Sequence, residues 1–297
     1  MKADLRFTDQ SLSFWAIVKL ASERAGYSTR KSKNNPNPMV KSLTPDEIRN
    51  ALEKQGIDLA NLSEAQIMLA SAYTVYRASV LNEQVEPALL DRASAKQLFL
   101  QAKRRVKPKH RIPMNRQKGD KRHEAYLAAL VGILAEEVLG ATNLVNDANC
   151  LAILTEQGVL QGIFSRRFDG AVPNTVDPVA IWEVKEYYGT TTFGSRVADG
   201  VYETLLDGFE IQQFEREYGR QVAHFLFVDD RFTWWEKGKS YLCRLIDMLH
   251  TGHVDEIFFG KQVITEWPQT LAVLRTSLAQ RPPNRATKAA DPSHARR

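Results

Sequence analysis

The chain has 297 residues, of which 43% are hydrophobic and 25% charged, with a formal net charge of +5. This balance is typical of a globular protein and excludes an intrinsically disordered chain. No apolar run reaches the roughly eighteen residues of a membrane span, and no apolar signal-peptide core follows the first residues, so a cytoplasmic protein is expected. With Cys150 and Cys243 as the only cysteines, a disulfide framework and a cysteine zinc site are excluded.

Helices are expected in the first hundred residues. Residues 12–24 show helical spacing, and capping signals open two more helices, at Thr44 and at Ser63. The Lys-, Asn- and Pro-rich residues 27–40 between the first two helices are expected to form a loop. This arrangement fits a helix-turn-helix-like reader of DNA, although three helices with a loop are common in any small bundle. Residues 1–105 are therefore interpreted as a helical accessory region and a candidate DNA-recognition domain.

A concentration of positive charge follows this region. Ten of the twenty residues 103–122 are Lys or Arg against the single acid Asp120, and two prolines indicate a connector over 106–122. Concentrated charge favours phosphate contact, because binding to a polyanion works through local counterion release; a solvated linker is the alternative. The basic residues 281–297 are expected to form a disordered tail. The predicted phosphate-contacting residues are Lys103, Arg104, Arg105, Lys107, Lys109 and Arg111.

From residue 123 the pattern becomes that of a layered α/β domain, which is predicted over 123–280. An amphipathic helix is expected from Glu124 to Leu139. Strands interleaved with helices indicate the layered architecture. The expected strands lie at 158–172, 179–188 and 221–228, and the expected helices at 196–218, 241–249 and 266–278.

Three charged residues lie at the expected strand ends. Strand alternation puts Glu183 and Lys185 on one face, and the preceding strand is expected to end in Asp169, next to a glycine that permits close approach of another group. An acid at an otherwise apolar strand end requires an explanation, and Mg²⁺ supplies one, because it needs only one or two protein carboxylates when phosphate completes its shell. Lys185 would orient the attacking water or help to deprotonate it. An ordinary ion pair between Glu183 and Lys185 is the alternative.

The order of these elements resembles the core of the restriction-endonuclease-like PD-(D/E)xK nuclease superfamily, over about residues 120–230. The resemblance implies an α/β/α core with a mixed central sheet and Mg²⁺ as cofactor. The proline that precedes the aspartate in the family is Phe168 here, which weakens the match without removing a ligand. In some members a glutamine on the helix after the lysine strand assists the site. The resemblance assigns metal binding to Asp169 and Glu183, catalysis to these two with Lys185 and the helix glutamate Glu124, and an assisting role to Gln212 or Gln213.

Three further groups have weaker support. Tyr187 and the loop through residue 192 lie just past the lysine, where they would contact phosphates or bases, or form a simple turn. His250 and His253, with Asp255, are a candidate transition-metal site, but the two histidines lack a third ligand of clear geometry, and capping of a helix end explains His250 equally well. The acids at 229 and 230 fit an ion-paired turn as well as a catalytic pair.

These observations predict a magnesium-dependent endonuclease that hydrolyses DNA, favouring a type II restriction or other defence endonuclease. A chain with its own helical region and no ATP-motor motif fits a stand-alone enzyme. The alternatives are a non-catalytic nucleic-acid-binding or regulatory protein, and a repair or RNA-directed nuclease of the same fold. Double-stranded DNA is the expected partner, no membrane association is expected, and a homodimer is left open.

Overall fold

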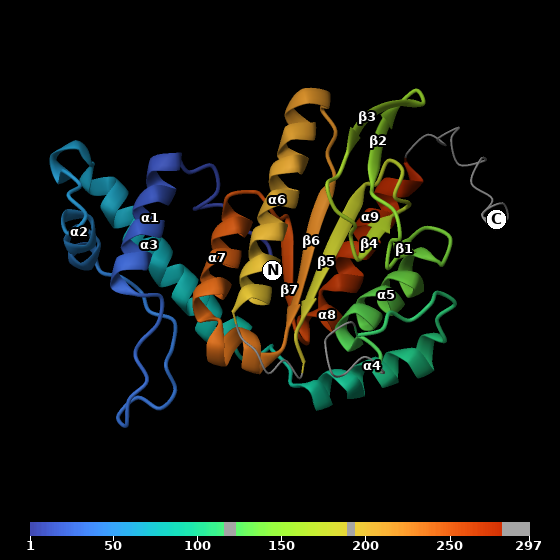
Figure 1. Cartoon of the computed structure of the whole chain (residues 1–297), viewed down its shortest axis with the longest axis horizontal. Helices are drawn as coiled ribbons and strands as arrows, with labels where there is room; N and C mark the ends of the chain where they lie inside the picture. Colours follow the sequence, from blue (N-terminus) through green and yellow to red (C-terminus); the bar gives the residue numbers. More distant parts are fainter. Residues whose placement is uncertain (116–122, 189–193, 281–297) are drawn as a thin grey trace.

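The amino-terminal part of the chain is helical, and the remainder builds a sheet with helices on both faces (Figure 1). The computed structural model describes residues 1–115, 123–188 and 194–280. Both predicted capping boxes are confirmed: the Thr44 and Ser63 side chains accept from the backbone N–H groups of Glu47 and Gln66. The elements of this part are α1 (Leu12–Ala25), α2 (Pro45–Glu53), a 3₁₀ turn (Leu59–Asn61), α3 (Glu64–Ser79) and a π-helical turn (Val80–Val85).

The central sheet is mixed. Within the described residues it has five strands in the order β1–β4–β5–β6–β7, with β4 antiparallel to both of its neighbours and β5, β6 and β7 parallel. A separate hairpin pairs β2 with β3. The strands are β1 (Val145–Asn146), β2 (Ile153–Glu156), β3 (Val159–Ile163), β4 (Gly170–Val172), β5 (Ala180–Glu186), β6 (Ala223–Asp229) and β7 (Glu256–Phe259).

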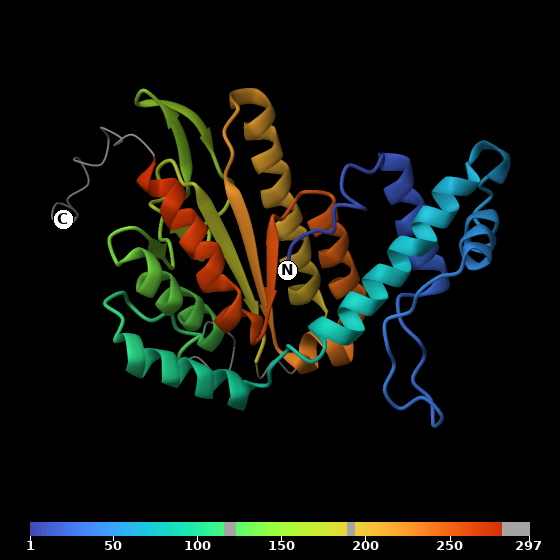
Figure 2. The ribbon, with the colours of Figure 1, turned by 180° about the vertical axis from the view of Figure 1, so that it is seen from behind.

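Helices cover both faces of this sheet, as the two opposite views show (Figures 1 and 2). Strand alternation sends Trp182 and Phe227 into the apolar layer with α5 (Tyr126–Leu139) and α9 (Trp267–Ala279). It sends Val228 and Phe259 into the layer on the other face. That second face is covered by α6 (Ser195–Tyr218) and α7 (Lys239–His250), and the remaining elements are α4 (Arg92–Val106), a π-helical turn (Phe232–Lys237) and α8 (Gln262–Thr265).

The prediction of a single strand over residues 158–172 is wrong. The segment forms two strands, because β3 ends at Ile163 and β4 begins only at Gly170. The residues between them follow α6 instead of the sheet: Ser165 donates through its backbone N–H to Glu210, and Arg166 donates to Asp207 at 2.8 Å. Asp169 therefore precedes a strand and does not end one.

The helix expected from Glu124 begins at Tyr126. Glu124 instead forms an antiparallel bridge with Met114, and the Ala125 N–H donates to the Pro113 carbonyl, which holds the chain extended before the helix. The expectation of an amphipathic helix is also wrong, since ten of the fourteen residues of α5 are buried. This helix lies between the sheet, α4 and α9, and so has apolar neighbours on most of its sides.

A buried ion pair joins the helical part to the sheet part. The Arg77 guanidinium of α3 donates through Nη1 to both carboxylate oxygens of Asp247 of α7, at 2.9 and 3.0 Å. The Tyr73 hydroxyl donates to the same carboxylate at 2.7 Å, and Arg77 Nη2 donates to the Ser22 hydroxyl at 2.7 Å. These contacts link α1, α3 and α7 through side chains that are all buried.

Among the described residues, no helix combines the length and the apolar character that a membrane span requires.

Candidate active site

Asp169 lies directly before β4 and beside the middle of β5. Its Oδ2 accepts a hydrogen bond from the Val184 backbone N–H at 2.8 Å. Gly170 makes this approach possible: a Cβ at this position would lie 2.0 Å from the Trp182 indole, so that any side chain would collide with the neighbouring strand. The expectation that this glycine serves a close approach is confirmed.

Glu183 and Lys185 share the face of β5 that is covered by α6. Lys185 Nζ lies 2.9 Å from Glu183 Oε2 and 3.0 Å from Glu203 Oε2 of α6. Gly200 allows the helix to come this close, since a Cβ there would lie 2.7 Å from the Tyr187 hydroxyl and 3.3 Å from Lys185 Cδ. Burial alone would lower the pKa of Lys185, but the negative charges of Glu183, Asp169 and Glu203 together outweigh it and raise that pKa, so the side chain is an ammonium.

Arg166 is a second cation in this cluster, and the sequence did not suggest it. Its Nη2 lies 3.3 Å from Glu183 Oε2 and 3.1 Å from Glu203 Oε2, and its Nη1 lies 2.8 Å from Asp207 Oδ2. Glu203 and Asp207 are also new. They occupy one face of α6 with a spacing of four residues, and a pair of acids at that spacing on the helix after the lysine strand was the available signal.

The carboxylates of this cluster are not fully satisfied. Glu183 Oε1 and Asp207 Oδ1 are buried, and neither has a hydrogen-bond partner among the described residues. Burial, together with the charge of Glu183, raises the pKa of Asp169 to about 7, and burial raises that of Asp207 to about 7 as well. Such oxygens would gain from an additional cation, because a buried acceptor without a partner is costly.

A pocket of about 370 Å³ opens beside Asp169 at the end of β5. Glu186 lies in it, and its Oε2 accepts from the Leu127 N–H at the first turn of α5, at 2.6 Å. Burial raises the pKa of Glu186 to about 8, although the N–H groups of the helix lower it. Glu186 was missed in the sequence because alternation puts it on the face opposite Lys185. The acidic residues that line the pocket are Asp147, Asp169, Glu186, Asp199 and Glu203.

These residues fit a hard divalent cation in part. Among the described residues, no group of three or more His, Cys, Asp or Glu side chains is arranged to hold a metal. Two neighbouring carboxylates, Asp169 and Glu183, with an unpartnered oxygen on the second, still suit Mg²⁺, which takes its other ligands from water and phosphate. They are the residues of this cluster that would hold it.

Comparison with known proteins gives families of unknown function. Residues 90–274 match the family described as Domain of unknown function (DUF7687), and residues 1–84 match Domain of unknown function (DUF7690). The chain belongs to the DUF7687 family. No curated protein and no solved structure matches it. The cluster and its pocket lie within the DUF7687 region. The boundary between the two family matches, at residues 84–90, lies before α4 and upstream of the expected boundary at 105.

Glu124 and the predicted basic residues lie at the edge of the DUF7687 region. The Glu124 carboxylate is 3.3 Å from Lys103 Nζ; the following alanines line the pocket, but Glu124 itself does not. Arg105 pairs with Glu137 at 2.7 Å, and helix α4 ends where Lys107 takes a left-handed conformation. The remaining predicted contacts, Arg104, Lys109 and Arg111, are exposed, while the basic residues of 116–122 lie outside the described residues.

The two glutamines of α6 do not reach the site. Gln212 donates to the backbone carbonyls of Thr251 and Gly252, and Gln213 donates to Glu217. Tyr187 does line the pocket, and its hydroxyl donates to the Arg196 carbonyl at 3.0 Å. The loop over 189–193 and the tail over 281–297 lie outside the described residues.

The weaker candidates have structural partners, except that His253 Nδ1 is buried without a hydrogen-bond partner among the described residues. His250 Nδ1 bonds the Ile246 carbonyl and its Nε2 accepts from the Asp4 N–H, so both ring nitrogens are used within the protein. Asp255 accepts from the His224 N–H at 2.7 Å. Asp229 accepts from the Leu90 N–H at 2.7 Å and from the Tyr188 hydroxyl, which ties the end of β6 to the start of the DUF7687 region.

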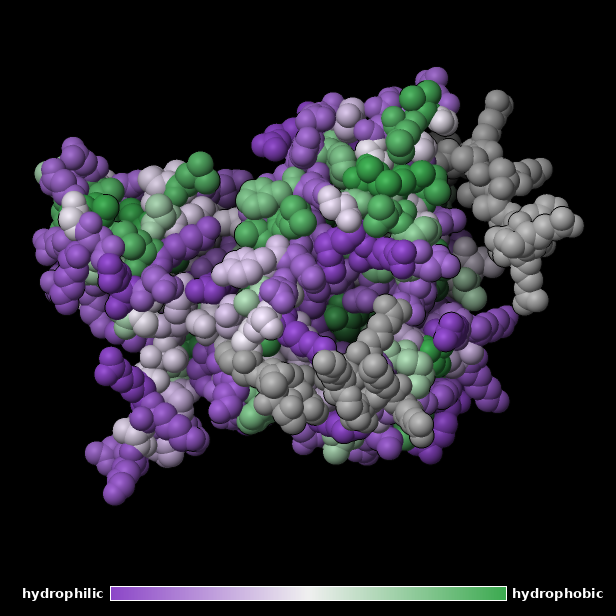
Figure 3. Space-filling view, viewed as in Figure 1, coloured by the Kyte–Doolittle hydropathy of each residue, from purple (hydrophilic) through white to green (hydrophobic). Residues whose placement is uncertain are grey.

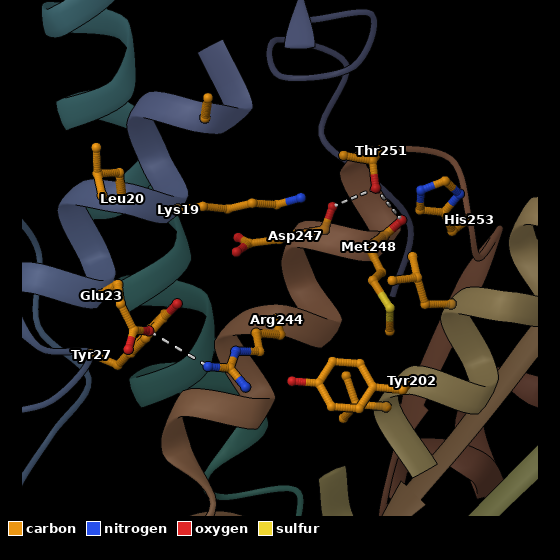
Figure 4. Close-up of a pocket in the computed structure, with 13 residues that line it drawn as sticks. Lys19, Leu20, Glu23, Tyr27, Tyr202, Arg244, Asp247, Met248, Thr251 and His253 are labelled. Carbon is orange, nitrogen blue, oxygen red and sulfur yellow. Dashed lines mark hydrogen bonds and ion pairs between the residues drawn. The ribbon is translucent and has the colours of Figure 1, made fainter. Parts of the chain in front are cut away.

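A second pocket, of about 480 Å³, lies between α1, α6 and α7 (Figure 4). Asp247 faces it from α7 but is held by Arg77, and Arg244 is directed toward Tyr27 and Glu23 of the helical part. Lys19, Thr251 and His253 also line it, but its two carboxylates, Glu23 and Asp247, are each paired with an arginine, so the lining offers no unpaired carboxylate for a divalent cation. The pocket beside Asp169 is therefore the candidate active site.

Proposed function

We propose that this protein is a magnesium-dependent endonuclease that hydrolyses DNA phosphodiester bonds. The observation that carries the proposal is that Asp169, directly before β4, lies beside the strand that carries Glu183 and Lys185 and lines an acidic pocket. A type II restriction enzyme or another defence endonuclease is the role that we favour, because the chain joins such a site to a separate helical region.

Each residue has a role that follows from its chemistry. Asp169 and Glu183 offer the oxygen ligands that Mg²⁺ prefers. When bound, the metal would lower the pKa of a water and offset charge on the phosphate. Lys185, an ammonium held by Glu183 and Glu203, would orient the attacking water and stabilise negative charge that develops on the phosphate. Glu186, whose pKa is about 8, is protonated in part near neutral pH and so can give a proton to a leaving oxygen.

We also propose that residues 123–280 form a restriction-endonuclease-like α/β/α core. The support is the sheet itself: the strand after Asp169 runs antiparallel to the Glu183 strand, which is followed by a long helix and a parallel strand. Helices α5 and α9 lie on one face and α6 and α7 on the other. A cytoplasmic location and a homodimer stay predictions.

Plasmid nicking by the full chain tests the proposed function. After treatment with a chelator, nicking should stop, and added Mg²⁺ should restore it. Asp169→Asn should abolish nicking in Mg²⁺ because it removes a ligand charge. Asp255→Asn is the matched control, since Asp255 also accepts a backbone N–H and burial also raises its pKa, but it lies outside the pocket.

The alternative is a nucleic-acid-binding or regulatory protein in which the cluster is structural. The observation in its favour is that Lys185 and Arg166 already neutralise much of the charge of Glu183. In that case the wild type, Asp169→Asn and Asp255→Asn would all nick plasmid to the same extent. A wild-type preparation that does not nick plasmid in any divalent cation would reject the nuclease proposal.

A further inference from the structure

A narrow arm, residues 27–41, extends from the helical part between α1 and α2 (Figure 1, lower left). Its two sides are joined by backbone hydrogen bonds from Lys41 N–H to the Tyr27 carbonyl, at 3.0 Å, and from Thr29 N–H to the Met39 carbonyl, at 2.9 Å. At the tip, Ser32 and Asn35 exchange backbone bonds of 3.0 and 3.1 Å. The segment expected to be a loop is thus a two-sided ribbon.

Side chains hold this ribbon in shape. Asn35 Nδ2 donates to the Thr29 hydroxyl at 2.9 Å and to the Arg30 carbonyl at 3.1 Å. At the base, the Asn82 amide accepts from the Val40 N–H and donates to the Val40 carbonyl, both at 2.9 Å, which fixes the arm to the π-helical turn after α3. A segment ordered before it binds loses less conformational entropy on binding.

The outer part of the arm carries positive charge without counter-ions, whereas Lys41 at the base pairs with Glu47. Arg30, Lys31 and Lys33 are exposed, and none of them forms an ion pair with any residue in the described part of the chain. In the sequence no acid occurs between Glu23 and Asp46. The space-filling view shows this projection as hydrophilic throughout its outer part (Figure 3).

This chemistry fits a nucleic acid better than a membrane or an apolar protein surface. The tip presents lysine and asparagine, which bind phosphates and base edges, and no aromatic or aliphatic wedge. The major groove of B-form DNA admits a two-stranded ribbon. In both views the arm projects on the lower side of the molecule, the side on which β5 and β6 end and α4 lies (Figures 1 and 2).

We propose that the basic arm, residues 27–41, enters the major groove of the DNA duplex whose backbone reaches the Asp169 pocket. The choice of DNA rests on the proposed nuclease function. The arm would extend the contact along the duplex beyond the site of cleavage, with α4 and residues 107–111 contacting phosphates on the other side of the pocket.

Binding to a short DNA duplex, measured over a series of salt concentrations in Ca²⁺, tests the arm. The variant Arg30→Gln/Lys31→Gln/Lys33→Gln should bind more weakly, and its slope of log affinity against log salt should fall by about 0.9 per lost contact, up to about 2.7 in total. Lys2→Gln/Lys54→Gln/Arg216→Gln is the matched control, because it removes the same charge at exposed positions away from the arm. It should keep the wild-type slope.

Two results would overturn the proposal: equal slopes for the arm variant and the wild type, or an equal fall in the arm variant and the control. The major groove of A-form RNA is too deep and narrow for a ribbon, so an equal loss on duplex RNA would reject entry into the groove. Hydrolysis of bis(p-nitrophenyl) phosphate separates this proposal from the nuclease. The arm variant should hydrolyse this small diester as the wild type does, whereas Asp169→Asn should not.

Discussion

Two buried charge clusters in this protein have opposite characters. In the Arg77–Asp247 cluster, both carboxylate oxygens accept hydrogen bonds and the arginine reaches a serine and a carboxylate. In the cluster of Glu183, Lys185 and Arg166, two buried carboxylate oxygens have no partner among the described residues, and neighbouring acids have raised pKa values. In the first cluster the protein satisfies both carboxylate oxygens, and only a donor, Arg77 Nε, lacks a partner among the described residues, whereas the unpartnered oxygens of the second would gain from an added cation. This contrast distinguishes a structural ion pair from a candidate active site.

The largest expected effect is on cleavage by Lys185→Met. Loss of a positioned ammonium beside the attacking water should reduce the rate of plasmid nicking by about two to four powers of ten. Duplex binding in Ca²⁺ should persist, because the carboxylates remain. Lys239→Met serves as the control, since Lys239 is also buried but donates to the Trp235 carbonyl outside the pocket. Equal nicking by the two variants would make Lys185 a structural residue.

The second effect is on stability. Arg77→Met leaves the Asp247 carboxylate buried beside only the Tyr73 hydroxyl, and removing one partner of a buried pair costs about 3–5 kcal/mol. Urea unfolding of Arg77→Met should show this loss. Arg166→Met should cost less, because the Arg166 side chain is 23% exposed and Lys185 still neutralises Glu183 after the change. A larger loss for Arg166→Met would reverse the contrast between the two clusters.

The smallest effect is on the pH dependence of stability. The pKa of Asp207 is about 7 in the folded protein and near 3.8 when unfolded, so its contribution to stability is fully present below about pH 4 and is lost as pH rises through 7. Asp207→Asn cannot lose a proton there. The difference in unfolding free energy, variant minus wild type, should therefore become more positive between about pH 5 and about pH 8. Urea unfolding at these two values measures it, and a difference that does not change with pH would contradict the raised pKa.

Local signals predicted much of the architecture. The capping boxes at Thr44 and Ser63, the long helix α6 and the strands β5 and β6 all follow from periodicity and end signals in the sequence. β4 and β7 have three and four residues, too few to show a period, and β7 was missed. Helix α4 was not predicted, because the basic residues of its last turn favoured a connector, although Asp91 caps the helix by accepting from the Ser94 N–H.

The sequence predicted only part of the candidate site, because a local pattern shows neighbours within one strand but not contacts between distant segments. Alternation along one strand is enough to put Glu183 beside Lys185. Arg166, Glu203 and Asp207 meet them only because a bent segment and a helix return to the strand. The four-residue spacing of Glu203 and Asp207 indicates a shared helix face, but it does not show which strand that face contacts. Glu186 was assigned no role because its strand face leads away from Lys185, yet the pocket reaches it at the start of α5.

The Arg77–Asp247 contact also limits how such a protein can be recombined. Its two halves match separate families, which invites the exchange of one helical region for another between related proteins. A replacement that packs well but lacks an arginine in the place of Arg77 would bury the Asp247 carboxylate without its cationic partner. The graft would fold poorly even with matched apolar surfaces. A successful chimera must therefore inherit the arginine with its helix, or replace Asp247 by a neutral residue in the same step.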